Sequence, residues 1–143
     1  MGLAQIKHLI KAGYAVSCCE QADTQQTKAL ALGAVLRESP EDVFAEASIV
    51  YIAVGFDPEV IKICRGDKGL LSSGRSDGIV VVNSTCDPEL MIELAHEFEA
   101  KGIEFLDVPI ARGGWAADNG TLLAMVGGLQ STLDQVKPSL STF

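Results

Sequence analysis

The sequence predicts an α/β domain in which helices cover both faces of a doubly wound, mostly parallel sheet. Two apolar runs, residues 48–54 and 79–82, have the length and continuity of strands buried on both faces. Segments with helical periodicity separate such runs, and three of them begin with a proline followed by glutamate. Strands that alternate with helices imply right-handed crossovers, and 143 residues suffice for one domain.

The first half of the chain opens on a helix. Leu3, Ile6 and Ile10 recur at helical spacing with Leu9 beside them, and Gly13 follows where a helix-ending glycine belongs. The elements predicted next are a strand over 14–19, a helix over 24–32 that ends at Gly33, a strand over 34–36, a helix beginning at Ser39-Pro40, and the strand over 48–54.

The second half continues the alternation. Asp57 and Asp87 each precede a proline and a glutamate, so we expect both to cap helices as Ser39 does. The helix after Asp87 carries an apolar face and ends at Gly102. The other elements predicted here are strands over 79–82, 103–106 and 121–126, and a helix over 131–140.

Composition and charge exclude several classes of protein. About half of the residues (48%) are apolar and 21% are charged, a globular balance without an apolar run long enough for a membrane span. Residues 1–8 lack a secretory signal pattern, and we expect a cytoplasmic protein. A net charge of −8 with scattered Lys and Arg argues against nucleic acid and anionic membranes as partners.

The four cysteines show no spacing typical of a disulfide framework or a metal site. Cys18, Cys19, Cys64 and Cys86 form no C-x-x-C pair and no cluster with histidine, so no metal is expected. We interpret them as reduced and mostly buried thiols, and a redox role has no spacing to support it.

Residues 1–16 resemble the opening of the β-hydroxyacid dehydrogenases, which include 3-hydroxyisobutyrate dehydrogenase and the cofactor domain of 6-phosphogluconate dehydrogenase. Their pattern is a strand, then G-x-G-x-M-G, a helix and K-A-G-[YH]-x-V, and Met1-Gly2 and residues 11–16 match its later parts. The resemblance implies a Rossmann-like NAD(P)-binding domain, with Gly2 as the third glycine. The match starts inside the fingerprint, so we expect residues 1–143 to be a partial domain that lacks the usual first strand.

The resemblance also implies which residues contact the cofactor. Glu20 ends the second strand, where an acid accepts hydrogen bonds from the ribose 2′-hydroxyl; no arginine follows it, which favours NAD over NADP. Val54 and Gly55 would lie along the adenine and ribose. Ser84 and Thr85, in a stretch that resembles V-D-x-S-T-x-x-P, would lie beside the nicotinamide. The alternatives are a solvated acid for Glu20 and helix capping for the Ser-Thr pair.

Residues 105–114 and 120–128 give the most specific resemblance, to F-L-D-A-P-V-S-G-G and G-T-L-x-x-M-V-G-G. In the family the S-G-G segment holds the substrate carboxylate, which implies Ala111, Arg112 and Gly113 as substrate-binding residues. Ala111 and Arg112 replace the usual serine and glycine. An arginine at this point could hold a carboxylate through two hydrogen bonds, and the alternative is a loop arginine that faces solvent.

No catalytic residue is assigned within this chain. The resemblance places the general acid–base lysine in a second, all-helical domain, and we expect residues 1–143 to lack that domain. Lys101 and Lys137 are interpreted as helix-surface residues, and so are His8 and His96, which have no partner that would form a catalytic dyad.

Two functional hypotheses follow, from different classes. The first is the NAD(P)-binding domain of an oxidoreductase that transfers a hydride between the cofactor and a small 3-hydroxy acid or its semialdehyde. The complete protein would bind that small molecule, and the resemblance makes self-association through the second domain an expectation. The second is a non-catalytic fragment or degenerate copy with weak or no nucleotide binding. A third hypothesis, another Rossmann-type enzyme such as a methyltransferase, does not explain the motif pattern of residues 107–128.

Overall fold

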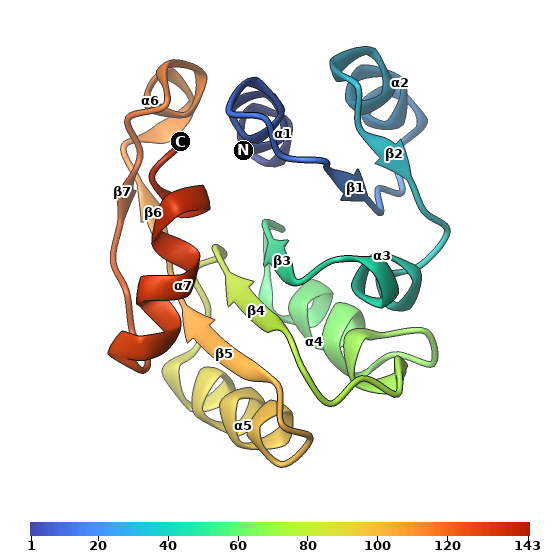
Figure 1. The fold of residues 1–143 in the computed structure, drawn as a ribbon, viewed down its shortest axis with the longest axis vertical. Coiled ribbons are helices and arrows are strands. Elements are labelled where there is room, and N and C mark those ends of the chain that lie inside the picture. Colours follow the sequence, from blue (N-terminus) through green and yellow to red (C-terminus); the bar gives the residue numbers. More distant parts are fainter.

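The computed structural model describes residues 1–143 and contains seven helices, seven strands and one 3-10 turn (Figure 1). The helices are α1 (Gly2–Lys11), α2 (Asp23–Leu32), α3 (Pro40–Glu46), α4 (Asp57–Arg65), α5 (Pro88–Glu99), α6 (Gly113–Asn119) and α7 (Gln130–Leu140). The strands are β1 (Ser17–Cys18), β2 (Val35–Leu36), β3 (Ile49–Ile52), β4 (Ile79–Val82), β5 (Glu104–Asp107), β6 (Ile110–Ala111) and β7 (Leu123–Ala124), and the turn covers Leu70–Ser72. No helix combines the length and the apolar character that crossing a membrane requires.

The sheet topology confirms the predicted α/β class with mostly parallel strands. Strands β3, β4 and β5 form one parallel sheet in that order, and β1 and β2 form a second parallel pair. Only β6 and β7 are antiparallel. The strands therefore do not form a single continuous sheet: β1 pairs only with β2, β3 pairs only with β4, and the facing edges of the two sheets are not hydrogen-bonded to each other.

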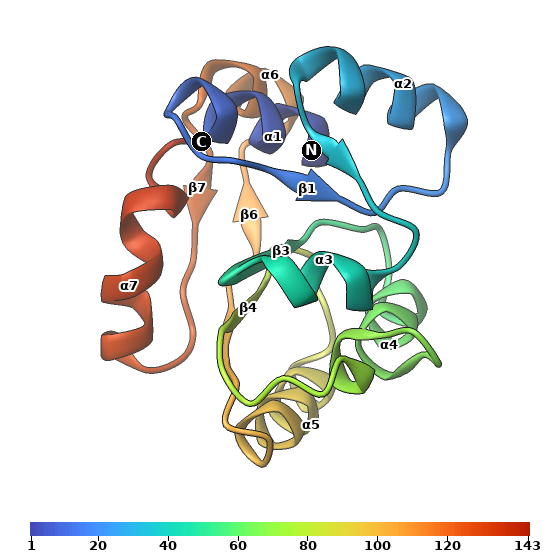
Figure 2. The same ribbon diagram turned by 45° about the vertical axis from the view of Figure 1, so that its right-hand side comes forward.

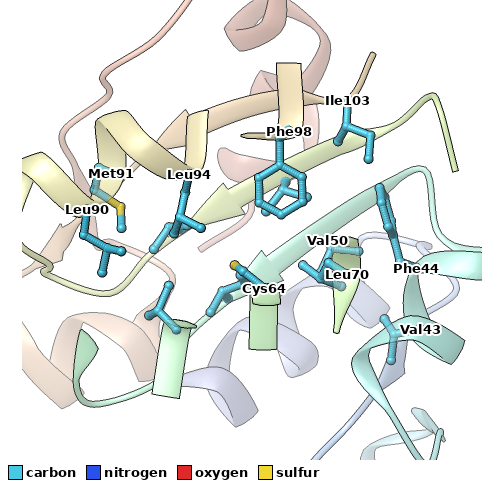
Figure 3. Close-up of a cluster of buried hydrophobic side chains, with 14 residues drawn as sticks. Val43, Phe44, Val50, Cys64, Leu70, Leu90, Met91, Leu94, Phe98 and Ile103 are labelled. Atoms are coloured by element: carbon cyan, nitrogen blue, oxygen red, sulfur yellow. The ribbon is translucent and has the colours of Figure 1, made fainter. Parts of the chain in front are cut away.

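Helices cover both faces of the β3–β5 sheet, as predicted. Helices α3, α4 and α5 contribute to the core on one face together with Val80 and Val82, while α1 and α7 pack on the other face with Val81. Figure 3 shows Leu94 and Phe98 of α5 facing Cys64 of α4 across the first core. Because alternate residues of β4 point into opposite cores, all four of its side chains are buried, which explains its unbroken apolar run.

Helix α1 presents a different face to the sheet from the one that its apolar spacing predicts. Gln5 and Leu9 are its buried residues, whereas Leu3, Ile6 and Ile10 are only half-buried. The reason is that α1 also packs against α2, and Ile10 reaches toward Gly33 at the end of that helix. The apolar stripe therefore faces the neighbouring helix as well as the core.

Two of the three predicted helix caps are confirmed. Ser39 Oγ accepts a hydrogen bond from the amide of Asp42, and Asp87 accepts one from the amide of Glu89. The prediction for Asp57 is wrong, because Asp57 is already the first residue of α4. The carboxylate of Glu59 instead accepts from the free amides at that helix end.

The sequence patterns also missed one helix. Helix α6 begins with two glycines, which are poor helix formers, and lies between the strands of the β6–β7 hairpin. Arg112 and Gly120 flank it, both in the left-handed conformation, so its length is set by the hairpin rather than by helix propensity.

Candidate functional site

The candidate site lies at the carboxyl ends of the parallel strands. The register pairs Ile52 with Val82 and Val82 with Asp107, so β3, β4 and β5 end at the same level. The segments that follow these strands therefore emerge along one edge of the sheet. Helices α1 and α6 lie side by side above this edge (Figure 2). In open α/β sheets, ligands bind at such an edge.

Ser84 connects the ends of β3 and β4. Its hydroxyl accepts a hydrogen bond from the amide of Val54 at 3.0 Å and donates to the carbonyl of Val54 at 2.9 Å. Ser84 is buried, while the following residue, Thr85, is exposed. Of the predicted pair, Ser84 therefore shapes the edge by holding Val54 in place, and Thr85 is the residue with a hydroxyl open to a ligand.

The turn after β3 is fixed by a single carboxylate. Glu59 Oε2 accepts hydrogen bonds from the amides of Gly55 and Phe56, each at 3.0 Å. The backbone of the predicted contact Gly55 is thus held by α4 itself, and the side chain of Phe56 is 74% exposed beside it. Phe56 is a surface residue of this edge that the sequence patterns did not single out.

Glu20 lies just beyond β1, and one of its two carboxylate oxygens is already used. Oε1 accepts from the amides of Gln21 and Ala22, at 2.8 and 3.0 Å. These two bonds fix the direction of the side chain, which is exposed. The structure gives Oε2 no hydrogen-bond partner, so this oxygen can accept from a ligand hydroxyl.

A hollow of about 540 Å³ lies beside Glu20 and is lined mainly by charged side chains. Its lining residues are Glu20, Gln26, Leu36, Arg37, Glu38, Asp42, Ala45 and Glu46. Arg37 is the only cation among them, and its guanidinium donates to both carboxylate oxygens of Glu46 at 3.1 and 2.6 Å. Four carboxylates against one guanidinium that is already paired give the hollow a negative potential.

Arg112 holds a strained backbone conformation at the start of α6. Its φ of 83° makes it the only residue other than glycine in the left-handed region, which costs about 1–2 kcal/mol for such a residue. Its side chain is exposed and makes one long contact, 3.4 Å from Nη1 to the carbonyl of Thr121. Ala111 is half-buried, and Gly113 is exposed with a φ of 71°. The three predicted substrate-loop residues thus form one turn, with the guanidinium free to bind a ligand.

Asp107 was not predicted as a site residue, although it lies within the motif that gave the strongest resemblance. Its backbone forms a bridge to Gly127, with N–O distances of 3.0 and 2.8 Å. Gly128, which follows Gly127, has a φ of 137°, and a Cβ at this position would lie 2.5 Å from Leu106 Cδ2. The carboxyl of Asp107 accepts no hydrogen bond, and partial burial raises its pKa above the usual value.

Cys86 lies near this carboxyl and keeps its proton at neutral pH. Burial, together with contact with Asp57, raises the pKa of the Cys86 thiol to about 12. The prediction of mostly buried cysteines is only partly right, because Cys64 is buried, Cys18 and Cys86 are half-buried, and Cys19 is exposed. A thiolate nucleophile at this edge is not supported, since a raised pKa suppresses the reactive form.

Helix α1 begins at this edge with Gly2. Its first turn contains no acidic side chain, and no side chain caps its amino end. A Cβ added at Gly2 would meet no atom within 4 Å, so the space beside this residue is open. The backbone amides at the start of a helix point out of it, and together with the helix dipole they favour an anion such as a phosphate at this end.

The histidines and lysines considered as catalytic candidates lie elsewhere. His8 Nε2 lies 3.0 Å from the carbonyl of Ala117 and 3.2 Å from that of Asp118, so it joins α1 to the end of α6. His96 is exposed on α5. Lys101 precedes β5, at the opposite end of the sheet, and Lys137 is exposed on α7.

Comparison with known proteins gives consistent matches. The family model described as the NAD binding domain of 6-phosphogluconate dehydrogenase matches residues 1–143. A mitochondrial 3-hydroxyisobutyrate dehydrogenase-like protein of Arabidopsis thaliana is 31% identical over 99% of this chain and 42% of its own length. Among solved structures, the 3-hydroxyisobutyrate dehydrogenase of Mycobacterium tuberculosis with L-serine is 30% identical, with a TM-score of 0.89 over 99% of this chain and 48% of that one.

A second solved structure, Psf3 in complex with NADP⁺ and 2-OPP, is 25% identical, with a TM-score of 0.90 over 100% of this chain and 51% of its own. The chain thus spans about half the length of the relatives that it matches.

Replacing Arg112 by glycine should stabilise the fold. Glycine adopts the left-handed conformation without steric cost, so we expect Arg112→Gly to raise the free energy of unfolding by about 1 kcal/mol. Urea denaturation followed by circular dichroism measures this change. Gly113→Ala, at a φ of 71° in open space, is the matched control and should destabilise the fold by about 1 kcal/mol. A loss of stability in Arg112→Gly would show that its backbone is not strained.

Replacing Asp107 by asparagine should stabilise the fold at neutral pH only. The folded-state pKa of Asp107 is raised, so its ionised form costs stability above that pKa, and the cost disappears once the carboxyl is protonated in both states. We expect Asp107→Asn to melt above the wild type at pH 7 and at the same temperature at pH 3. The exposed Asp67→Asn serves as the control and should show no such difference between the two pH values. An equal effect of Asp107→Asn at both pH values would contradict the burial argument.

Proposed function

This chain belongs to the family of the NAD binding domain of 6-phosphogluconate dehydrogenase, and from that premise we propose that it binds NAD along the carboxyl edge of its strands. We further propose that the complete protein oxidises a small 3-hydroxy acid, or reduces its semialdehyde. The observation that carries the proposal is the free carboxylate oxygen of Glu20 beside a hollow at this edge.

The pyrophosphate of the cofactor is assigned to the amino end of α1. The amides of its first turn have no side-chain partner, and the helix dipole favours an anion there. Gly2 contributes no side chain at this helix end, and a Cβ there would meet no atom within 4 Å. These features support the proposal that the pyrophosphate lies where the family pattern assigns it.

The adenosine half is assigned to the acidic hollow. Glu20 Oε2 would accept a hydrogen bond from a ribose hydroxyl, as carboxylates do in NAD-specific sites. A 2′-phosphate would instead meet four carboxylates, while the only cation, Arg37, is held by Glu46. Like-charge repulsion therefore supports NAD over NADP as the preferred cofactor.

The nicotinamide and the substrate are assigned to the other half of the edge. Thr85 has an exposed side chain beyond β4, where the nicotinamide ring would lie. Arg112 would bind the substrate carboxylate through its guanidinium, which has no acidic partner within the chain. A carboxylate ligand would thus explain why the strained backbone of Arg112 is retained.

NAD supplies a hydride acceptor when it is bound, and the residues of this chain orient the two reactants. The carbon that bears the hydroxyl would lose a hydride, and the hydroxyl proton would go to a base. Lys101, Lys137 and His96 lie away from the carboxyl edge, and His8 bonds to backbone carbonyls. We therefore propose that this base belongs to the second half of the complete protein, which the family resemblance implies.

A chain that retains the fold without binding nucleotide is the competing hypothesis. The two parallel sheets are not joined, so the adenosine and nicotinamide halves of the edge stand on separate sheets. Nucleotide binding requires these sheets to keep a fixed spacing. Direct measurement of binding separates the two hypotheses.

We expect the chain to bind NADH at least about tenfold more tightly than NADPH, because a 2′-phosphate would be repelled by the acidic hollow. Energy transfer from Trp115, the only tryptophan, to the nicotinamide measures both affinities. Glu20→Gln should weaken NADH binding by about tenfold, because it removes a charge-assisted hydrogen bond to the ribose.

The matched control is Glu99→Gln, an exposed acid at the end of α5, which should leave both affinities unchanged. Absence of saturable binding of either nucleotide would contradict the proposed function and favour the competing hypothesis. Tighter binding of NADPH would overturn the NAD preference alone.

A further inference from the structure

Two buried amide side chains connect α1 to the sheet. Gln5 Nε2 donates to Asn83 Oδ1 at 3.0 Å, and Asn83 Nδ2 donates to the carbonyl of Val108 at 2.9 Å. Gln5 and Asn83 are each only 3% exposed. The backbone amide of Asn83 also donates to the carbonyl of Ile52, at 2.7 Å. One short chain of hydrogen bonds therefore joins α1, β3, β4 and the segment after β5.

The polarity of this pair is unexpected for its surroundings. Gln5 occupies the face of α1 that meets the sheet, next to the buried Leu9, where an apolar residue would pack without cost. A buried amide stabilises little by itself and is costly when its partner is lost. Its hydrogen bonds are directional, however, and they fix relative positions more sharply than apolar contacts do.

Three of the four connected segments lie next to positions to which the proposed function assigns ligand groups. Gln5 lies one turn after Gly2, at the pyrophosphate end of α1. Asn83 immediately precedes Ser84 and Thr85, and the carbonyl that Asn83 binds lies four residues before Arg112. The adenosine hollow, in contrast, is lined by residues of α2 and α3 and by residues around β1 and β2, and none of these residues takes part in this chain of hydrogen bonds.

We infer that Gln5 and Asn83 are positioning residues, which hold Thr85 and the Arg112 turn at a fixed distance from the amino end of α1. This inference rests on the proposed function. The pair fixes the nicotinamide half of the dinucleotide site and does not reach the acidic hollow of the adenosine half. Loss of the Gln5–Asn83 hydrogen bond should therefore weaken the binding of ligands that contact the nicotinamide side more than that of ligands that do not.

The test compares NADH with ADP-ribose, which keeps the adenosine, the pyrophosphate and the second ribose but lacks the nicotinamide. Isothermal titration calorimetry gives both dissociation constants for the wild-type chain and for Gln5→Met, which keeps the length of the side chain but removes the amide. We expect Gln5→Met to raise the dissociation constant of NADH by about tenfold, which is the effect of one lost interaction. The dissociation constant of ADP-ribose should rise by less than about twofold.

Thr132→Val is the matched control, because it removes a buried hydroxyl that donates to Glu104 at the amino end of β5, far from the carboxyl edge. It should leave the ratio of the two dissociation constants unchanged. Gln5→Asn, which withdraws the amide by one methylene group, should change the ratio in the same direction as Gln5→Met and replaces it if that variant does not fold.

An equal loss of both ligands in the Gln5 variants would show a merely structural role and overturn the inference. An unchanged NADH affinity in these variants would overturn it as well. If the wild-type chain binds neither ligand, the proposed function itself is contradicted. The wild-type titration alone shows this outcome, so it is distinct from a failure of the inference, which only the variants can show.

Discussion

The parallel register of β3, β4 and β5 is the constraint on which the rest of the structure depends. Because Ile52, Val82 and Asp107 end their strands at one level, the turns that follow lie along a single edge. The register in turn requires β4 to be buried on both faces, which α3, α4 and α5 achieve on one side and α1 and α7 on the other. If the register of β4 shifted by one residue, the side chains of Val80 and Val82 would point to the opposite face of the sheet. The turns that form the site would then no longer end at the same level.

The polar side chains at the amino end of the sheet have hydrogen-bond partners, whereas Asp107 and Arg112 at the carboxyl end have few or none. At the amino end, the guanidinium of Arg75 donates to the carbonyls of Phe44 and Ala47 and pairs with Asp77, and Glu104 accepts from Thr132 and Gln135. At the carboxyl end, Arg112 is strained, and the buried part of Asp107 has no donor. Strain and incomplete solvation of this kind concentrate at functional sites, since selection for stability alone would remove them.

The carboxyl edge has two parts, one beyond the β1–β2 sheet and one beyond the β3–β5 sheet. The acidic residues around β1 and β2 suit the uncharged hydroxyls of a ribose, whereas the edge beyond β4 and β5 offers the guanidinium of Arg112. The hydrogen bonds of Gln5 and Asn83 stiffen only the second of these regions. Under the proposed function, cofactor preference and substrate binding would therefore depend on separate groups of residues within one domain.

The sequence by itself determined the alternation of elements, the buried strands and the caps at Ser39 and Asp87, because these depend on local periodicity and on backbone amides close in the chain. It also determined the family, through motifs whose spacing the fold preserves. Only the tertiary structure decided that Gln5 faces the sheet, that Ser84 bonds to Val54, and that α6 forms from two glycines between paired strands. These features depend on residues many positions apart, and the angle at which a helix meets its neighbours is not encoded in the spacing of its own apolar residues.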